Sequence, residues 1–555
     1  MLVTGRVSEV DGDPLAGAQA QVGTAGTLSA ESGTFEIRLE EGAVDTGSAD
    51  LRVQLIGYQS VELPLDAEPG QRIDVTVRMC PLALALESMV IASAEIQPAA
   101  SVTNVQHAGV DEGGIVKLRD RHLVVLRRGR LHTVDLGDDA LVEVDATEAF
   151  AEGIDASGDW YDEILLSGSD VVVLGYSYDR AATEIGLFRL ADDGTLSHRA
   201  THQLRSFDYY SSRNYASRLV DGRLVLYAPM PLYGGEDPRR GLPAIRRWTP
   251  DGSETFEPVV SSSRVYQGGY PLDPEQTPVL HTILSCGVEA PELDCRTTAV
   301  VGGWSRVSYV SPEAVWLWVD GSGNDGAAML YRLPLDGAPP GAVQVRGSPV
   351  DQFSFLEDAD DHLNVVVRSV GYGEGMWGPE WSGGDVALLR LPVAALGDGR
   401  DSVPSAAYRP LPEPAPGQAF HNRFVGEHLL YGSGSGWGPP DTTAVSLVHV
   451  VGIESGAVAS LSVPHGVERI EPMGSDAVVV GSAGEDLHFT GIDLDALPST
   501  VQHFVLEGAS QGELRSHGFF YRADGEGDGV LGLPVAGPAR PGWRHLVDGS
   551  ASVVF

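Results

Sequence analysis

The chain has 555 residues, which is too long for one ordinary core. Hydrophobic residues make up 43% and the mean hydropathy is near zero, which is typical of a soluble globular protein. Its formal net charge of −40 repels nucleic-acid phosphates and anionic lipids, so we expect no binding to either through a basic face. We interpret the charge as a solvated acidic surface, and a cation-binding surface is the alternative.

No apolar run reaches the about 18 residues that a transmembrane helix needs. No signal peptide is present, since the chain opens on the strand-like segment LVTGRVSEV. We expect either a cytosolic protein or a chain that starts after a removed export signal.

Residues 2–79 contain short alternating segments with turns about every ten residues, which is typical of a small antiparallel β-sandwich. Strands are expected from residue 2 and at 35–39, 51–55 and 73–77, with turns at 13–18, 32–34 and 57–58.

This unit resembles the carboxypeptidase-regulatory-like domain, a transthyretin-like β-sandwich. The matching residues span nearly the whole unit: Gly5, Val7, Pro14-Leu15-Ala16-Gly17-Ala18, Gly33, Phe35 and Gly57-Tyr58. In exported bacterial proteins the resemblance implies an accessory or adhesive module without catalysis.

Residues 80–102 are interpreted as a linker. Its segment 86–92, LESMVIA, is similar to the short strand that follows such domains in outer-membrane receptor proteins, where docking to an energising partner is conceivable. A plain extended linker strand is the interpretation that we favour.

From residue 103 one pattern recurs: an apolar strand, a polar turn and a second apolar strand. The expected strand pairs are 122–126 with 130–136, 170–176 with 184–190, 314–319 with 328–333, 362–368 with 385–391, 427–431 with 446–451, 476–481 with 487–493 and 517–521 with 529–533, and a further strand covers 223–227. Units start roughly fifty residues apart, with a longer gap around 230–310, which indicates propeller blades.

The sequence therefore predicts an all-β chain in three parts. The first is the transthyretin-like β-sandwich (1–79), the second the linker (80–102), and the third a β-propeller (103–555) of seven or eight blades, with eight favoured.

The stretch TNVQHAGVDEGGIVK, residues 103–117, resembles the opening of a family of secreted prokaryotic β-propeller domains. Members start with TNVQ, a spacer, GVDE and IVK. Later matches at 217–222, 351–354, 422–426 and 531–535 extend the resemblance over 103–535. The sequence departs from the family at Gly114, where an acidic residue is usual, and at Arg119-Asp120, where a DG turn is usual. The resemblance implies an exported or surface-anchored propeller but no established reaction, so no catalytic residue carries over.

Asp111 and Glu112 within this opening are adjacent carboxylates before a strand. Such a pair can hold a cation or act as acid and base. We favour a structural role, in which an Asp caps a turn and fixes the backbone where the ring closes.

Cys286 and Cys295 bracket the short loop CGVEAPELDC and can close across a hairpin. We predict a disulfide between them and hence an oxidising compartment. Two free thiols are the alternative, and Cys80 is left over.

Two glycine-rich loops carry aromatic side chains: residues 371–384, with Tyr372, Trp377 and Trp381, and residues 432–441, with Trp437. Each joins the second and third strands of its unit, so in a propeller these connections emerge on one face. Those at 176–184, 228–245 and 320–327 belong to the same set. Because long loops are uncommon unless functional and tryptophan offers flat apolar surface, we predict ligand binding at these four residues. The alternative is that the rings cover their own loops.

Asp524, Glu526 and Asp528 alternate with glycines, as oxygen ligands do in the first half of a calcium loop. The bidentate Glu expected later is missing, since Val535 stands there. Calcium is the one cofactor that the sequence suggests, and an ordinary hairpin turn is the favoured alternative.

Six histidines lie in the last third of the chain, at 421, 449, 465, 488, 503 and 517. None has the close spacing of a metal motif such as HExxH, so we interpret them as surface or hydrogen-bonded side chains. No nucleophile elbow, Walker loop or dinucleotide fingerprint occurs in the sequence, and a triad assembled across blades stays open.

Three functions follow, of which we favour the first. It is an exported or cell-surface protein, extracellular or in the bacterial cell envelope, that binds an envelope protein or carbohydrate as a monomer and without catalysis. The second is a propeller hydrolase or lyase with carboxylates and histidine at the central channel, and the third is a structural spacer. An enzyme should gather charged side chains with shifted pKa values at the centre, whereas a binding protein should expose aromatics on one face.

Overall fold

The computed structural model describes residues 2–79 and 105–554, apart from 10–11, 13, 16–17, 23–24, 31, 40–48, 55–60, 66–71, 137–140, 207–216, 233–241, 252–253, 270–276, 321–326, 373–380, 415–418, 435–445, 496, 524–528 and 537–549. The chain divides into two compact units, residues 1–99 and 100–555. The regular elements are β-strands and short 3-10 helices, so the prediction of an all-β chain is confirmed. Among the described residues, no helix is long and apolar enough to cross a membrane.

The first unit contains two sheets. One has the order β4 (Thr34–Arg38), β1 (Leu2–Glu9) and β7 (Arg72–Met79), with β1 antiparallel to β4 and parallel to β7. The other has the order β3 (Ala25–Leu28), β2 (Gln19–Val22), β5 (Ala49–Gln54) and β6 (Val61–Leu65). Buried residues of both sheets, including Val3, Val7, Ala20 and Leu51, form one hydrophobic cluster.

Two glycines of the carboxypeptidase-regulatory-like pattern have a steric cause. A Cβ at Gly5 would lie 2.6 Å from the Phe35 ring, and Gly33 has a φ of +74°, which favours glycine. The strands predicted at 35–39, 51–55 and 73–77 correspond to β4, β5 and β7, while Gly57-Tyr58 lies outside the described residues. The family of this unit stays a prediction.

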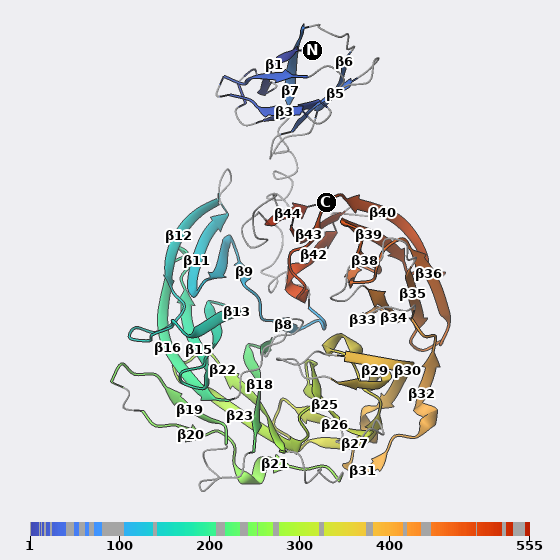
Figure 1. Ribbon diagram of the computed structural model, residues 1–555. Helices are drawn as coiled ribbons and strands as arrows, with labels where there is room; N and C mark the ends of the chain where they lie inside the picture. The colour runs from blue at the N-terminus through green and yellow to red at the C-terminus, as the bar shows by residue number, and fades with distance from the viewer. Residues whose placement is uncertain are drawn as a thin grey trace. The chain divides into compact units, whose positions relative to one another are not determined.

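The described strands of the second unit form eight sheets arranged around a ring (Figure 1). The first sheet contains β9 (Val116–Arg119), β10 (His122–Arg127), β11 (Arg130–Leu136) and β12 (Leu141–Glu148). The second contains β13 (Asp159–Ser167), β14 (Asp170–Ser177), β15 (Ala182–Leu190), β16 (Leu196–Arg205), β19 (Ala244–Arg247) and β20 (Glu257–Pro258). The third contains β8 (Val110–Glu112), β17 (Ser217–Val220), β18 (Arg223–Pro231), β22 (Val279–Gly287), β23 (Asp294–Gly302) and β21 (Val265–Tyr266).

The remaining five sheets continue around the ring. The fourth contains β24 (Arg306–Val310), β25 (Ala314–Asp320), β26 (Ala327–Pro334), β27 (Gly341–Arg346) and β31 (Asp398–Ser402), and the fifth β28 (Phe355–Glu357), β29 (His362–Tyr372), β30 (Trp381–Pro392) and β32 (Tyr408–Leu411). The sixth contains β33 (Ala419–Val425), β34 (His428–Gly434), β35 (Ser446–Gly452) and β36 (Val458–Val463). The seventh contains β37 (Arg469–Met473), β38 (Asp476–Ala483), β39 (Asp486–Asp493) and β40 (Ser499–Leu506), and the eighth β41 (Ser510–Gln511), β42 (Phe520–Ala523), β43 (Gly529–Ala536) and β44 (Ser550–Val554).

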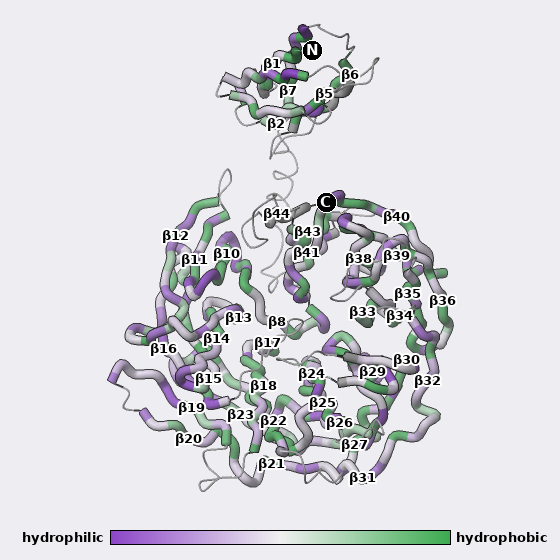
Figure 2. Tube along the Cα trace, viewed as in Figure 1, coloured by the Kyte–Doolittle hydropathy of each residue, from purple (hydrophilic) through white to green (hydrophobic). Residues whose placement is uncertain are grey.

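Apolar side chains fill the interfaces between neighbouring sheets. Val124 of the first sheet and Phe188 of the second belong to one buried cluster. Trp316 and Trp318 of the fourth sheet are fully buried and cluster with Phe355 of the fifth. Figure 2 shows apolar and polar residues interleaved along the strands.

The strand pairs predicted after residue 103 are all present, with two corrections. The strand expected at 517–521 begins only at Phe520, because a 3-10 helix, η6 (Ser516–Gly518), precedes it. Residues 228–245 are not a simple loop, since β18 continues to Pro231 and β19 joins the second sheet. Pro229 and Pro231 occur in β18 because β17 pairs with it only as far as Leu226, so their missing amide hydrogens leave no ladder bond broken.

Candidate functional site at the centre of the ring

Strand β8, which carries the GVDE motif, lies at the centre of the ring (Figure 1). It pairs antiparallel with β17, so that Glu112 lies opposite Arg218. The following Gly114 donates its amide hydrogen to the carbonyl of Ile164 at 3.2 Å, and the amide of Ile164 donates to the carbonyl of Gly114 at 2.7 Å. The segment therefore joins the third sheet to the second at their inner edges.

Lys117 and Asp111 form a buried ion pair next to β8. The Lys117 Nζ donates to Asp111 Oδ1 at 2.8 Å, to Oδ2 at 3.0 Å and to the carbonyl of Glu112 at 2.6 Å. The Lys117 side chain is 0% exposed and that of Asp111 is 13% exposed. Burial disfavours both charges, so it lowers the pKa of Lys117 and raises the pKa of Asp111, and their mutual attraction opposes both shifts.

Glu112 connects three distant parts of the chain. Its carboxylate accepts hydrogen bonds from the Ser516 hydroxyl of η6, from the Gln106 amide at 3.2 Å and from the Gln352 side chain at 3.5 Å. Gln352 belongs to the 3-10 helix η3 (Gln352–Ser354) before the fifth sheet. Because Glu112 is only 1% exposed, these bonds compensate its charge inside the ring.

The TNVQ part of the opening motif is held by the same region. The Gln106 side chain donates to the carbonyl of Phe355 at 3.0 Å, and Arg423 of β33 donates to the carbonyl of Val105 at 3.1 Å. Thr103 and Asn104 lie outside the described residues. The motif residues thus bind the chain to its own inner strands.

Glu163 of β13 is a buried carboxyl group beside this segment. The Ser217 hydroxyl donates to Glu163 Oε2, and a Cβ at Gly113 would lie 2.8 Å from the same oxygen. Burial, reinforced by the neighbouring Asp162, raises the pKa of Glu163 to about 8. The group is therefore protonated over much of the neutral range.

Four arginines on or beside the inner strands compensate the central carboxylates. Arg469 donates to Glu471 at 2.8 Å, and Arg423 of the neighbouring sheet lies 3.6 Å from the same carboxylate. Arg515 donates to Asp162 at 3.0 Å, which joins the eighth sheet to the second. Arg218 donates to the Gln352 side chain.

His517 of η6 completes the central cluster. Burial lowers its pKa to about 4, against the opposing effect of Glu513, whose carboxylate lies 3.6 Å away. A Cβ at Gly114 would lie 3.6 Å from the Cβ of His517. A side chain at this position would therefore lie next to the imidazole.

The residues at the centre of the ring show only part of what was expected of an active site. Charged groups with shifted pKa values converge there, as expected of the second function. They are, however, buried and bonded to one another. Within the described parts of the chain, no group of three or more His, Cys, Asp or Glu side chains is arranged to hold a metal ion. The arrangement ties the inner strands together and can hold protons on Glu163 at neutral pH.

The structure places the predicted aromatic residues only in part. Tyr372 and Trp381 are register partners at the end of the β29–β30 pair, which is the second and third strand of the fifth sheet. Trp377 and Trp437 lie outside the described residues. Tyr178, in the corresponding connection between β14 and β15, is 51% exposed and packs edge-on against Tyr176.

The predicted calcium ligands Asp524, Glu526 and Asp528 also lie outside the described residues. The strands on either side are paired, with Ala523 opposite Gly529.

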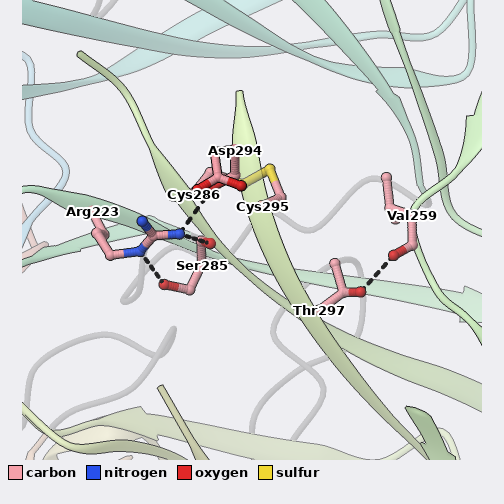
Figure 3. The surroundings of a disulfide bond; sticks show 7 residues. All are labelled: Arg223, Val259, Ser285, Cys286, Asp294, Cys295 and Thr297. Atoms are coloured by element: carbon pink, nitrogen blue, oxygen red, sulfur yellow. Dashed lines mark hydrogen bonds between the residues drawn. A yellow bond between two sulfur atoms is a disulfide. The ribbon is translucent and has the colours of Figure 1, made fainter. Parts of the chain in front are cut away.

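The Cys286–Cys295 disulfide is present between β22 and β23, where the two residues are register partners (Figure 3). Arg223 binds this pair of strands from outside, donating to the carbonyl of Ser285 at 2.6 Å and to that of Asp294 at 2.9 Å. Cys286 is buried. The disulfide thus lies within the third sheet, separated from β8 by the two strands β18 and β17.

Lys117, Arg218 and Arg423 were expected only as parts of the matching motifs, without a role at a site, and Arg469, Arg515 and Glu163 were not expected there at all. The signal for the arginines was available, because several inner strands repeat an Arg followed by an apolar residue and a turn: RLVDG at 218–222, RFVG at 423–426 and RIEPMG at 469–474. Glu163 had no such signal, since only the fold brings it next to Ser217.

A search of the curated proteins finds no match. Among solved structures the chain is similar to Pyrococcus horikoshii acylaminoacyl peptidase, with 8% identity, a TM-score of 0.30, and coverage of 78% of this chain and 58% of that one. A Synechocystis apocarotenoid oxygenase mutant matches with 10% identity, a TM-score of 0.27 and 89% and 93% coverage, and Kluyveromyces lactis Hsv2 with 10% identity, a TM-score of 0.26 and 70% and 95% coverage. The chain spans little more than half the length of the peptidase. Scores this low carry no functional argument.

The β-propeller domain model matches residues 100–387, which include the GVDE segment and the inner-strand residues up to η3. This match covers more than half of the chain and agrees with the ring of sheets. The chain belongs to the β-propeller domain family.

Proposed function

We propose that this chain is an exported or cell-surface binding protein with an eight-bladed propeller as a rigid, non-catalytic scaffold. Its ligand is a protein or carbohydrate of the cell envelope, bound by the loops between second and third strands. The N-terminal unit serves as an accessory or adhesive module, and the disulfide supports an oxidising compartment.

The observation that carries this proposal is that the central carboxylates are buried and hydrogen-bonded. Glu112, Glu163 and Glu471 are each at most 5% exposed and bonded within the chain, so a substrate has no direct access to them. The centre then serves to hold the blades together, and binding is left to the loops. Tyr178 supports this, since it is an exposed aromatic ring in one loop of the same set.

The test is a thermal-shift screen of the intact protein against cell-wall fragments, oligosaccharides and envelope peptides. A ligand that binds the folded state raises the melting temperature by mass action. The shift should disappear in the triple variant Trp377→Ala, Trp381→Ala, Trp437→Ala. It should persist in Phe504→Ala, which removes an exposed ring from the outer strand β40. A shift that the triple variant retains would contradict binding by this loop face.

A second function, hydrolysis with an acid–base group at the centre, is favoured by one observation. Glu163 has a pKa raised to about 8 and accepts a hydrogen bond from the Ser217 hydroxyl. Its burial opposes this role. Turnover of an ester or glycoside panel that is lost in Glu163→Gln would support the enzyme and overturn the scaffold.

A further inference from the structure

Three histidines that are far apart in the sequence gather on the seventh sheet, away from the centre of the ring. His488 lies on β39, His503 on β40, and His465 in the turn before β37. Their ring centroids are 5.1 Å apart for His488 and His503, 5.5 Å for His465 and His488, and 6.1 Å for His465 and His503. The sequence analysis had interpreted these residues as scattered.

The strand register explains why they meet. His503 lies opposite Thr490, and His488 lies two residues before Thr490, so both imidazoles share one face of the sheet. His465 reaches the same face because β38 has Gly481 opposite His488. A Cβ at Gly481 would lie 1.7 Å from the carbonyl oxygen of Gly466, so only glycine allows this close approach.

The three imidazoles have different roles. His465 is 1% exposed, and its two ring nitrogens bond the Gly466 carbonyl at 2.8 Å and the Thr490 hydroxyl at 2.7 Å. It therefore forms a fixed wall. His488 is half-buried and His503 exposed, and His488 Nδ1 lies 3.0 Å from His503 Nε2. Between two neutral imidazoles, only one of these facing nitrogens carries a proton, and the other offers a lone pair.

Replacing the shared proton by a metal ion requires little movement. With metal–nitrogen bonds of about 2.0–2.1 Å, two nitrogens 3.0 Å apart subtend an angle of about 95° at the ion. This is near the right angle between neighbouring ligands in the tetragonal geometry of Cu(II) and Ni(II), and below the tetrahedral angle of zinc.

We propose that His488 and His503 form a two-imidazole site for a late first-row divalent metal ion, Cu(II) or Ni(II), with water completing the coordination. Imidazole nitrogen suits these ions, whereas calcium and magnesium prefer oxygen. The half-buried His488 and the stacked His465 fix the ring orientation on one side, while the exposed His503 leaves the other side open.

A further observation supports the site. The net charge of −40 attracts dications to the surface. Because no third His, Cys, Asp or Glu of the described residues completes a ligand set, the site is bidentate, and water positions stay available to a small ligand.

The test is a titration of the full chain, stripped with chelator, with Cu(II) at neutral pH, followed by electron paramagnetic resonance and calorimetry. We expect one equivalent with splitting from two nitrogens, lost in both His488→Ala and His503→Ala. The control His428→Ala removes a half-buried histidine on β34 and should leave this equivalent unchanged. Ni(II) should raise the melting temperature of the parent and of His428→Ala, but not that of His488→Ala or His503→Ala. Ca(II) and Mg(II) should not change the difference in melting temperature between the parent and these two variants.

Because His503 is exposed, replacing it should not unfold the protein, so a loss of copper binding in His503→Ala can be assigned to the site. Without metal, His503→Ala should unfold at the same urea concentration as the parent, so a lost equivalent reports the site itself. A Cu(II) stoichiometry and nitrogen splitting that are the same in the parent and in His503→Ala, or the absence of any bound ion in the parent, would overturn the proposal.

Discussion

The buried Lys117 ammonium bonds both carboxylate oxygens of Asp111, at 2.8 and 3.0 Å. Asp111 belongs to the GVDE segment and to β8, and Lys117 lies in β9, so the ion pair ties β8 to the first sheet. Asp111 therefore has a structural role, as favoured from the sequence, but it acts through this ion pair within a strand and not as the predicted turn cap.

Lys117→Met should destabilise the propeller strongly. It leaves the Asp111 carboxylate without its cation in a position that is 13% exposed, and breaking a buried pair costs about 3–5 kcal/mol in free energy of unfolding. Urea unfolding followed by tryptophan fluorescence measures the loss. The double variant Asp111→Leu, Lys117→Met should recover much of it, because no charge is then left unpaired.

The matched control is Arg130→Met. Arg130 and Glu148 form an ion pair at 3.7 Å in which both side chains are about half exposed. Such pairs contribute about 0–1 kcal/mol. Equal losses in the free energy of unfolding for Lys117→Met and Arg130→Met would mean that the central pair stabilises the fold no more than an exposed pair does.

Glu163 should make the protein less stable as the pH rises from 6.5 to 8. Its pKa is raised to about 8 in the folded chain, so over this range the folded state holds a proton that the unfolded state has released. The free energy of unfolding then falls by up to about 1.4 kcal/mol per pH unit. The buried histidines, with pKa values lowered to about 4 for His465 and His517, act in the opposite direction near pH 6.5, because the unfolded state still binds protons there that the folded imidazoles do not.

Glu163→Gln should remove this slope while keeping an oxygen that accepts the Ser217 hydrogen bond. Urea unfolding of both proteins at several pH values between 6.5 and 8 measures this, because the histidine contribution is common to the two and cancels in their difference. The stability of the parent relative to the variant should fall as the pH rises, and a difference that stays constant or rises contradicts the assignment of a raised pKa to Glu163.

The Cys286–Cys295 disulfide should stabilise the third sheet moderately. The two cysteines are nine residues apart, and closing a loop of about ten residues in the unfolded chain contributes about 2–3 kcal/mol. Reducing agent should therefore lower the melting temperature of the parent and leave that of Cys286→Ala, Cys295→Ala unchanged. When the oxidised protein is alkylated and analysed by mass spectrometry, Cys286 and Cys295 should carry no alkyl group. Alkylation of both thiols would refute the bond.

The strand pairs were predictable because each alternates or runs apolar between Gly, Asp and Pro turns, and the structure places β11 at 130–136 as the pattern indicated. Prediction failed where contacts with neighbouring strands determine the local structure. Residues 228–245 were expected to form a loop, yet Pro229 and Pro231 belong to β18 and are tolerated where that strand lacks a partner on one side. The ring-centre partners of Glu112 come from segments that only closure of the ring brings together, and the imidazole pair of His488 and His503 depends on the register of two neighbouring strands.

Gly481→Ala should disrupt the turn that carries His465. The added methyl would lie 1.7 Å from the carbonyl oxygen of Gly466 and 3.0 Å from the His465 ring, and backbone in a packed sheet cannot yield without losing contacts. We expect a loss of at least about 2 kcal/mol in the free energy of unfolding. Gly397→Ala is the control, because nothing lies within 4 Å of its added methyl and its φ is not positive. That variant should match the parent within about 0.5 kcal/mol or exceed it slightly. Urea unfolding of both variants decides the matter: if Gly481→Ala is as stable as Gly397→Ala, then the turn does not pack against β38, and His465 does not form the wall behind His488 and His503.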